Sequence, residues 1–231
     1  MKRHATVAAM LLAALLTACH KKENTEEPAP AATPAPATGT APAAAPAATT
    51  PPAEQTPEQR EQARKKELLE YGVMEDKYIN DPRAQWATEA KASSTFNPAS
   101  NTKPEDPNRP ERAVGAADGN SWTNGSTDKG FDWLELAYAT PVNATDVRVV
   151  VSDGQGVEAL NKVELQDTDG AWHTAWEGVN DVKRDARGNR TWFVRSFNKT
   201  AYKVKSVKIT YANNLQHDYK IVDAVQLVGD K

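Results

Sequence analysis

The C-terminal part of the chain carries the period of β-strands. In Val204–Tyr211 apolar residues largely alternate with polar ones, which places one face of a strand against a core and the other in water. Turn signals such as Asp169-Gly170 separate runs of this kind. The predicted strands are Trp133–Tyr138, Ala144–Val151, Lys162–Asp167, Trp172–Glu177, Thr191–Phe197, Val204–Tyr211 and Ile221–Val228. Because no helical pattern lies between them, we predict an all-β fold, an antiparallel β-sandwich of the jelly-roll type, over residues 84–231.

A helical period precedes the sandwich, over residues 57–80. Thr56 suits the cap of a helix, and Gln59 stands three residues after it, as a capping box requires. Asp81-Pro82 is a stop signal. Four apolar residues recur at helical spacing in this segment: Leu68, Tyr71, Met74 and Tyr78. We therefore predict a short α-helix whose apolar stripe docks on the sandwich or mediates self-association.

The first residues form an export signal. Two basic residues precede the apolar run Ala8–Leu16, which is too short to span a bilayer comfortably. The run leads into Leu16-Thr17-Ala18-Cys19, which resembles a bacterial lipobox. The resemblance implies a lipoprotein signal peptide over residues 1–18, cleavage before Cys19, diacylglycerol on the Cys19 sulfur and an acyl chain such as palmitate on the new amino terminus.

Acylated Cys19 would make membrane lipid a partner of the protein. Two or three acyl chains hold a protein at a membrane far more firmly than one chain does. The residue after the cysteine is His20 and not aspartate, which by the enterobacterial sorting pattern indicates the cell outer membrane. An ordinary cleaved signal is the alternative. We therefore expect an exported protein that is anchored to a membrane by lipid.

Residues 19–56 join this anchor to the predicted helix. Between residues 28 and 57 stand nine Pro, twelve Ala and six Thr, with Glu54 as the single charge. Such a segment has no large apolar side chains to bury, so it cannot offset the entropy cost of folding. We predict a disordered, extended linker that spaces the folded part from the lipid. A Pro-rich ligand for a partner domain is the alternative, although the prolines keep no fixed PxxP register.

The charge balance and the cysteine count exclude several function classes. The 28 basic and 31 acidic residues give a net charge of -3 without a basic block, so no nucleic-acid partner is predicted. Cys19 alone cannot form an internal disulfide, and only His173 and His217 follow residue 20, which leaves little material for a His/Cys metal centre. Without an HExxH, a GxSxG or a phosphate-binding glycine loop, we predict that the protein is not an enzyme.

The body carries short motifs in a fixed order. They are Ala92-Ser93-Ser94-Thr95, Ala117-Asp118-Gly119-Asn120-Ser121-Trp122-Thr123, Phe131-Asp132-Trp133-Leu134-Glu135-Leu136, Val163-Glu164-Leu165, Asp169-Gly170-Ala171-Trp172-His173-Thr174 and Val222-Asp223-Ala224-Val225-Gln226-Leu227-Val228-Gly229. Together they resemble the galactose-binding-like jelly rolls, which include discoidin (coagulation-factor type C) domains, bacterial carbohydrate-binding modules and the scarf domain of pappalysins. The resemblance implies an eight-stranded sandwich without catalytic chemistry that binds glycans, lipids, peptides or neighbouring domains through loops at one end.

The same resemblance implies a structural calcium ion. In many members of the group an Ala-x-Asp-Gly loop and a carboxylate near the last strand hold Ca²⁺. Here Asp118, Asn120 and Asp223 offer oxygen ligands of the kind that a hard cation prefers. The alternative is that Asp118-Gly119 forms a turn and Asp223 caps a loop by accepting hydrogen bonds from backbone amides. Ala224 can also occupy the position of the last-strand carboxylate.

Ligand contact requires flat apolar faces and planar hydrogen-bonding groups, because a sugar offers both kinds of surface. The candidates are Trp122, Asn124, Phe131, His173, His217, Arg184, Arg187 and Arg190. For the strand tryptophans we predict core packing: Trp133, Trp172, Trp176 and Trp192. For Trp122, in a polar loop, core packing and ligand contact are equally favoured. The basic residues between 183 and 190 form either a solvated loop or a site for an anionic glycan, a lipopolysaccharide phosphate or a peptidoglycan carboxylate.

These observations predict a membrane-anchored cell-envelope lipoprotein that presents a non-catalytic binding module. Its ligand is a carbohydrate or another component of the cell envelope, such as a cell-envelope polymer. The runner-up is an accessory or assembly lipoprotein that binds a protein partner in an envelope complex. A hydrolase is the third interpretation: Glu135, Glu164 and Glu177 lie in predicted strands and are candidates for a glycosidase pair, although no motif supports one.

Overall fold

One helix precedes the strands. The structure, a computed structural model, describes residues 55–100 and 102–231, so the predicted signal peptide, Cys19 and nearly all of the linker lie outside the described residues. Helix α1 spans Pro57–Ile79 and begins with a capping box. The Thr56 amide donates to Oε1 of Gln59 over 2.9 Å, and the Gln59 amide donates to the Thr56 hydroxyl over 3.3 Å. These bonds satisfy two amides that the N-terminus of a helix leaves without partners. No helix among the described residues is long and apolar enough to cross a membrane.

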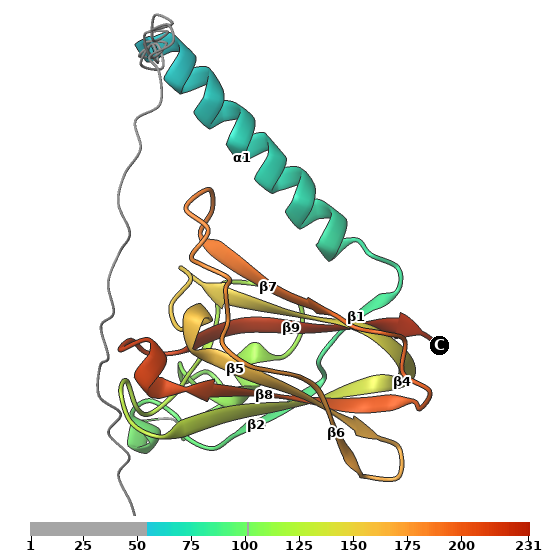
Figure 1. The fold of residues 1–231 in the computed structure, drawn as a ribbon. Helices are drawn as coiled ribbons and strands as arrows, with labels where there is room; N and C mark the ends of the chain where they lie inside the picture. Colours follow the sequence, from blue (N-terminus) through green and yellow to red (C-terminus); the bar gives the residue numbers. More distant parts are fainter. Residues whose placement is uncertain (1–54, 101) are drawn as a thin grey trace, which may run out of the picture. The chain divides into compact units, whose positions relative to one another are not determined.

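The strands form two packed antiparallel layers (Figure 1). Those described are β1 Ala84–Trp86, β2 Glu89–Ala92, β3 Trp122–Thr123, β4 Phe131–Ser152, β5 Leu160–Asp167, β6 Trp172–Glu177, β7 Arg190–Ser196, β8 Val204–Ala212 and β9 Ile221–Asp230. One layer, which we call the five-strand sheet, has the order β2-β4-β8-β5-β6. In the other, the helix-side sheet, β9 pairs with β1, β3 and β4, and β7 pairs with β4. The predicted antiparallel sandwich with a preceding helix is therefore confirmed.

Strand β4 belongs to both layers. Its first half pairs with β8 in the five-strand sheet, and its second half pairs with β9 and β7 in the helix-side sheet. The two strands predicted here, Trp133–Tyr138 and Ala144–Val151, are thus one strand of 22 residues. The register against β8 shifts between Ala137 and Val142. Pro141 is tolerated inside this shift, because an irregular stretch does not require every ladder hydrogen bond.

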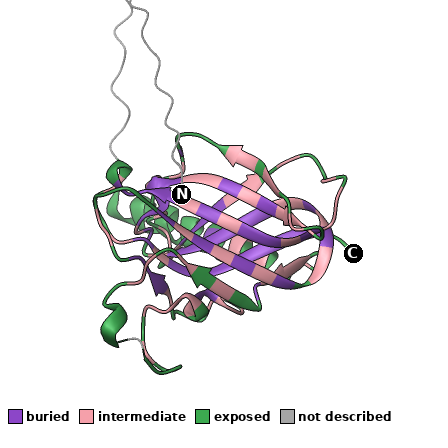
Figure 2. Ribbon diagram, turned by 90° about the horizontal axis from the view of Figure 1, so that it is seen from below, coloured by how far each residue is buried: buried purple, intermediate pink, exposed green. Residues whose placement is uncertain are grey.

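The hydrophobic core lies between the two layers. Alternate residues of each strand enter it, so that Leu134 and Leu136 meet Val147, Phe193 and other residues of the opposite sheet, all fully buried. Figure 2 shows this alternation as bands of buried and intermediate residues along the strands. The period-2 pattern of the sequence is therefore the pattern of the core.

Helix α1 packs on the outer face of the helix-side sheet through its C-terminal half. Met74 and Tyr78 contact a small cluster formed by Val150, Trp192 and Ala224. The Tyr78 and Trp192 rings lie 5.1 Å apart between centroids. The N-terminal residues of the helix, up to position 70, are all exposed. Tyr71, Met74 and Tyr78 of the predicted apolar stripe therefore dock on the sandwich, whereas Leu68 is exposed.

The strand tryptophans do not fill the core as predicted. Trp192 is buried, but beneath α1 and outside the space between the sheets. Trp133 and Trp172 are only half-buried, because the alternation that turns Leu134 inward turns Trp133 to the outer face. Trp176 packs on Phe193 at the edge of the core, with 5.6 Å between the ring centroids.

Candidate functional site

Most of the predicted site residues gather at one end of the sandwich. Strand β4 both begins and ends there, and the connecting segments 93–121, 124–130, 153–159, 178–189 and 213–220 meet at this end, which we call the loop end (left in Figure 1). Backbone hydrogen bonds join these segments to one another: the Asn213 amide donates to the Gly130 carbonyl over 3.0 Å, and the Asp153 amide to the Asn189 carbonyl over 2.8 Å. The loop end is thus a continuous surface of loops.

A polar hollow lies in this surface. It consists of two adjoining cavities of about 370 Å³ and about 270 Å³, which share Gly119 and Ser152 in their walls. Amide and hydroxyl side chains form much of the wall: Asn108, Asn120, Ser121, Thr123, Ser152 and Asn189. Charged side chains complete it: Glu105, Arg112, Asp153, Arg190 and Asp223. We call this feature the polar hollow.

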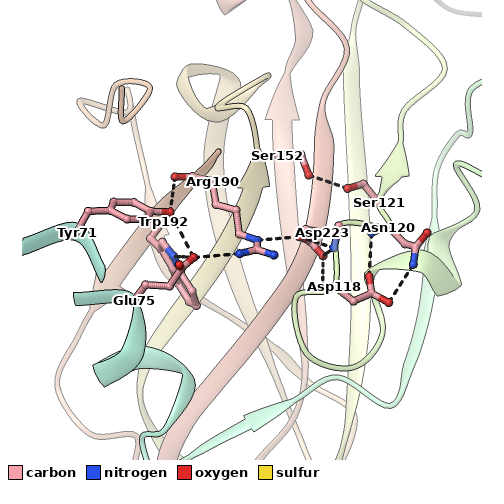
Figure 3. Close-up of polar contacts among 10 residues, drawn as sticks. Tyr71, Glu75, Asp118, Asn120, Ser121, Ser152, Arg190, Trp192 and Asp223 are labelled. Atoms are coloured by element: carbon pink, nitrogen blue, oxygen red, sulfur yellow. Dashed lines mark hydrogen bonds and ion pairs between the residues drawn. The ribbon is translucent and has the colours of Figure 1, made fainter. Parts of the chain in front are cut away.

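The Asp118-Gly119 segment forms a turn at the rim of the hollow (Figure 3). Gly119 has a φ of 90°, a backbone conformation that favours glycine. Asp223, at the start of β9, accepts hydrogen bonds from the Asp118 amide over 3.0 Å and from the Gly119 amide over 3.2 Å. Asp118 in turn accepts from the backbone amide and the side-chain amide of Asn120, over 2.8 and 2.9 Å. The carboxylate of Asp223 therefore caps the turn.

This geometry does not fit the calcium ion that the resemblance implied. Asp223 is also bound by the Arg190 guanidinium, whose Nε lies 3.2 Å from Oδ2, so a cation already faces this carboxylate. Both oxygens of Asp118 accept from Asn120, and no group of three or more His, Cys, Asp or Glu residues within the described ranges has the geometry of a metal site. A hard cation needs six to eight oxygens at about 2.3–2.6 Å. The capped turn is the alternative that the sequence left open.

Arg190 connects the hollow with α1 through a set of contacts that we call the helix relay: Tyr71, Glu75, Arg190, Trp192 and Asp223. The Glu75 carboxylate accepts from Arg190 over 3.3 Å and from the Trp192 indole over 3.4 Å. The Tyr71 hydroxyl donates to the Arg190 carbonyl over 3.0 Å. Burial, followed by the charge of Glu75, raises the pKa of Tyr71 to about 12, and burial also raises the pKa of Asp223. A residue of α1 thereby fixes a charged side chain in the wall of the hollow.

The other basic residues of segment 178–189 also have acidic partners. Arg187 forms a bidentate pair with Asp185, with nitrogen-to-oxygen distances of 2.9 and 2.8 Å. Arg184 lies 3.7 Å from Asp153, and Lys183 pairs with a glutamate of the neighbouring loop. An anionic ligand would therefore have to compete with an internal carboxylate for each of these cations.

Two of the predicted ligand residues are buried. Trp122 is 0% exposed; its indole donates to the Ser94 carbonyl over 3.0 Å, and its ring packs against Tyr211. Asn124 is also 0% exposed. Neither can offer a face to a ligand at the surface, so core packing is the correct alternative for Trp122, and the predicted ligand contact of Asn124 is wrong. The small polar residues around Trp122 are typical of a surface loop, but β3 pairs with β9 and turns this ring into the core.

Asn124 belongs to a buried polar cluster that the sequence did not predict. Its centre is Asp132, which accepts hydrogen bonds from the hydroxyls of Ser93 and Ser94 and from the side-chain amides of Asn124 and Asn213, over 2.5–2.9 Å. Burial favours the neutral acid, but these bonds outweigh it and hold the pKa of Asp132 below its ordinary value. We call these five residues the buried cluster. It ties three segments of the loop end together.

The remaining predicted ligand residues lie at both ends of the sandwich. Phe131 at the start of β4 is 65% exposed, and His217 is exposed in segment 213–220 of the loop end. His173 lies at the opposite end, near the β5–β6 turn, where it pairs with Asp167 over 2.7 Å and stacks on Tyr202 at 4.1 Å. It therefore does not share a site with the others.

An aromatic pair at the loop end was missed. The rings of Phe96 and Tyr219 contact each other edge to face, with 4.9 Å between centroids, and Phe96 is 38% exposed. The Phe96 amide donates to the carbonyl of Thr123, a residue of the hollow, over 2.8 Å. Both aromatics stand in short polar stretches outside the predicted strands, which is where an exposed aromatic residue is most informative.

No protein-family profile and no curated protein sequence matches the chain. Among solved structures, an F5/8 type C domain from Bacteroides fragilis is similar at 12% identity and a TM-score of 0.49, over 65% of this chain and 99% of that one. A family 32 carbohydrate-binding module from C. perfringens, in complex with galactose, is similar at 12% identity and a TM-score of 0.45, over 64% and 96% of the two chains. A chitosan-binding module from Paenibacillus sp. IK-5 gives 13% and 0.44, over 62% and 96%. These domains are of the discoidin and carbohydrate-binding class that the sequence motifs resemble.

Proposed function

We propose that the protein is a non-catalytic binding module whose polar hollow takes a neutral, hydroxyl-rich ligand, of which a carbohydrate is the most fitting class. The observation that carries the proposal is the lining of the hollow, in which amide and hydroxyl side chains from several segments face the same space. Sugar hydroxyls both donate and accept hydrogen bonds, and amide side chains offer both partners in one plane.

The aromatic residues of the loop end support the same ligand class. Phe96 packs on Tyr219 and its amide bonds to Thr123 of the hollow, and Phe131 is exposed on the same end of the sandwich. The apolar face of a sugar ring packs on aromatic side chains, while its hydroxyls bind polar groups nearby. The combination of a polar hollow with partly exposed aromatic residues at the same end of the sandwich therefore favours a carbohydrate over an apolar small molecule.

The pairing of the basic residues favours a neutral ligand over an anionic one. The three arginines that the sequence offered as anion contacts all lie near carboxylates: Arg184 near Asp153, Arg187 near Asp185, and Arg190 between Glu75 and Asp223. A phosphate or carboxylate ligand would lose affinity in displacing these partners. An uncharged glycan needs no such exchange.

The module is proposed to stand on a membrane, held by lipid on Cys19, with the outer membrane as its location. The support is the sequence Leu16-Thr17-Ala18-Cys19 and the Pro/Ala-rich linker that follows it. Cells fed an alkyne-labelled palmitate should incorporate the label into the wild-type protein and not into Cys19→Ser. Label on the variant, or a wild-type protein recovered without lipid, would disprove the anchor.

The binding proposal is tested with the purified protein on a glycan array, followed by calorimetry with the best neutral oligosaccharide. Asn189→Ala removes an exposed amide from the wall of the hollow, and we expect at least tenfold weaker binding. The matched control is His173→Ala, at the opposite end, which should bind as the wild type does. Equal losses in both variants, or binding that is confined to anionic glycans, would contradict the proposal.

A protein partner is the second candidate, and the exposed apolar side chains of α1 favour it. Leu69 is 68% exposed and Val73 is 63% exposed, one helical turn apart. Crosslinking in cells separates the two candidates. A single stoichiometric protein partner that is lost in Leu69→Ser and retained in Asn189→Ala would replace the carbohydrate proposal with this one.

A further inference from the structure

Lys220 is a buried lysine whose ammonium group donates hydrogen bonds to backbone carbonyl oxygens. It directly precedes β9, and its side chain is 0% exposed. Four carbonyl oxygens surround its Nζ: those of Thr127 at 3.0 Å, Asn213 at 3.3 Å, Gln216 at 2.8 Å and Asp218 at 2.6 Å. An ammonium group has three protons, so these acceptors satisfy all of its hydrogen-bonding capacity.

The carbonyl cage joins two loops of the loop end. Thr127 belongs to segment 124–130, and the other three carbonyls belong to segment 213–220. The Lys220 backbone is held as well: its amide donates to Oδ1 of Asn124 over 2.8 Å, and its carbonyl accepts from the Asn124 amide over 3.2 Å. The lysine therefore lies at a fixed point between the two loops.

The chain also packs tightly behind the lysine. A Cβ atom on Gly156 would lie 2.7 Å from the Cα of Lys220, and Gly156 has a φ of 88°. A glycine is needed here for both reasons. Burial is the largest influence on the Lys220 pKa and lowers it, while the carboxylates of Asp132, Asp218 and Asp128 act in the opposite direction.

Carbonyl oxygens that converge on one point form a cation site. Rings of backbone carbonyls can replace the hydration shell of an ion, and without a positive charge their dipoles repel one another. The distances in the cage, 2.6–3.3 Å, bracket those of an ammonium hydrogen bond, which are about 2.7–2.9 Å, and all but the shortest are longer than the Ca–O distances of about 2.3–2.6 Å. The cage thus suits an ammonium group or a large monovalent cation, and not calcium.

We propose that Lys220 is a built-in cation: its ammonium group occupies a carbonyl cage and holds segments 124–130 and 213–220 together, as a bound metal ion would. The cage without the lysine side chain is then a binding site for potassium or ammonium ions. This inference goes beyond the proposed function and does not depend on it, because it concerns how the loop end is held and not what the hollow binds.

The test compares melting temperatures of the purified wild-type protein and Lys220→Ala in different salts at equal ionic strength. In tetramethylammonium chloride, whose cation has no N–H group and is too large for the cage, we expect the variant to melt about 10 °C below the wild type. Potassium or ammonium chloride should recover several degrees of that loss. Lys220→Met, which fills the cage without a charge, should be destabilised and gain nothing from either salt.

A matched lysine at the other end provides the control. The Lys205 side chain donates to a single carbonyl, that of Thr168, over 3.2 Å at the surface. Lys205→Ala should melt like the wild type in every salt. A Lys220→Ala protein that is as stable as the wild type, or that gains equally from all salts, would overturn the proposal. So would a wild-type protein whose melting temperature rises on addition of calcium.

Nuclear magnetic resonance of the wild-type protein keeps the proposal testable if Lys220→Ala does not fold. The Nζ resonance of Lys220 should be that of a protonated amine at neutral pH, with ammonium protons that exchange slowly with water because four carbonyls shield them. A neutral amine, or protons that exchange as fast as those of Lys205, would overturn the built-in cation.

Discussion

Two charged groups at the loop end are held in opposite ways. In the buried cluster, the carboxylate of Asp132 is held by four hydrogen bonds from hydroxyl and amide groups. In the helix relay, Arg190 stands between the carboxylates of Glu75 and Asp223, so charge is balanced by charge. The first arrangement lies within the sandwich, and the second joins the sandwich to α1.

The difference indicates which contacts maintain the sandwich and which maintain the docking of the helix. Removing one of the three buried members, Asp132, Asn124 or Asn213, deprives an interior polar group of a hydrogen bond that water cannot replace. In the helix relay Tyr71, Trp192 and Asp223 are buried, but Glu75 and Arg190 are partly exposed, so water can reach the Arg190 guanidinium when Glu75 is removed. We therefore expect the buried cluster to determine global stability and the helix relay to determine the position of α1.

The largest effect is expected from Asp132→Ala. The change removes the carboxylate that accepts from Ser93, Ser94, Asn124 and Asn213, and should lower the free energy of unfolding by about 3–5 kcal/mol. Chemical denaturation followed by tryptophan fluorescence measures it. Asp128→Ala, an exposed aspartate four residues earlier, is the control and should stay within about 0.5 kcal/mol of the wild type. A loss below 1 kcal/mol for Asp132→Ala would remove the distinction between the two groups.

Gly188→Ala tests the helix relay, because Gly188 packs against Tyr71. A Cβ atom at this position would lie 2.4 Å from the ring carbon Cζ of Tyr71, so the new methyl group must displace the tyrosine. We expect a loss of about 1–3 kcal/mol, confined to the contact between α1 and the sandwich. Hydrogen exchange should then accelerate in α1 and not in β8. Acceleration in both would mean that helix and sandwich unfold as one unit.

The pH dependence of stability should have opposite signs for the two carboxylates. The pKa of Asp132 is lowered on folding, so its ionised form stabilises the fold above pH 4, and this contribution is lost as the pH falls through the folded pKa. The pKa of Asp223 is raised on folding, so its contribution is present at low pH and is lost as the pH rises through the folded pKa.

Denaturation between pH 2 and 7 measures both effects, each limited to about 1.4 kcal/mol per pH unit for one proton. In Asp132→Asn the free energy of unfolding should fall less as the pH is lowered than it does in the wild type. Asp223 lowers the free energy of unfolding as the pH rises above 4, and Asp223→Asn should remove this decrease. The free energy of unfolding of the variant should therefore rise more steeply between acid and neutral pH than that of the wild type. If the slopes of unfolding free energy against pH change in the same direction in both variants, relative to the wild type, then the pKa values of Asp132 and Asp223 are not shifted in opposite directions by folding.

Much of the sandwich could be predicted because strand period and core coincide. The strand Val204–Tyr211 was predicted from its alternation, and β8 spans Val204–Ala212 with its apolar residues in the core. The short strands β1, β2 and β3 were missed, since two to four residues carry too little periodicity. The merging of two predicted strands into β4 also escaped prediction, because Pro141 usually ends a strand.

The site was harder to predict because burial decides the role of each polar residue. Trp122 and Asn124 stand in a sequence of small polar residues that is typical of a surface loop, yet both are 0% exposed. Phe96 and Tyr219 stand in similar surroundings and are partly exposed. No local pattern separates these cases, since the pairing of β3 with β9 is a contact between residues about 100 positions apart in the sequence.

The smallest effect is expected from Glu75→Gln, which keeps the shape of the side chain and removes its charge from the helix relay. Glu75 contacts Arg190 and Trp192 across a half-exposed boundary, so we expect a loss of about 1 kcal/mol or less. The Tyr71 pKa of about 12 should fall, because the charge of Glu75 is the second largest influence that raises it. The fall should be partial, since burial is the largest influence on the Tyr71 pKa.

Titration of the Tyr71 ring by nuclear magnetic resonance measures this pKa, with Glu70→Gln as the exposed control on the same helix. An unchanged Tyr71 pKa would mean that the contact between α1 and Arg190 is not maintained in solution, whereas a return to the ordinary value near 10 would mean that the whole helix has left the sheet.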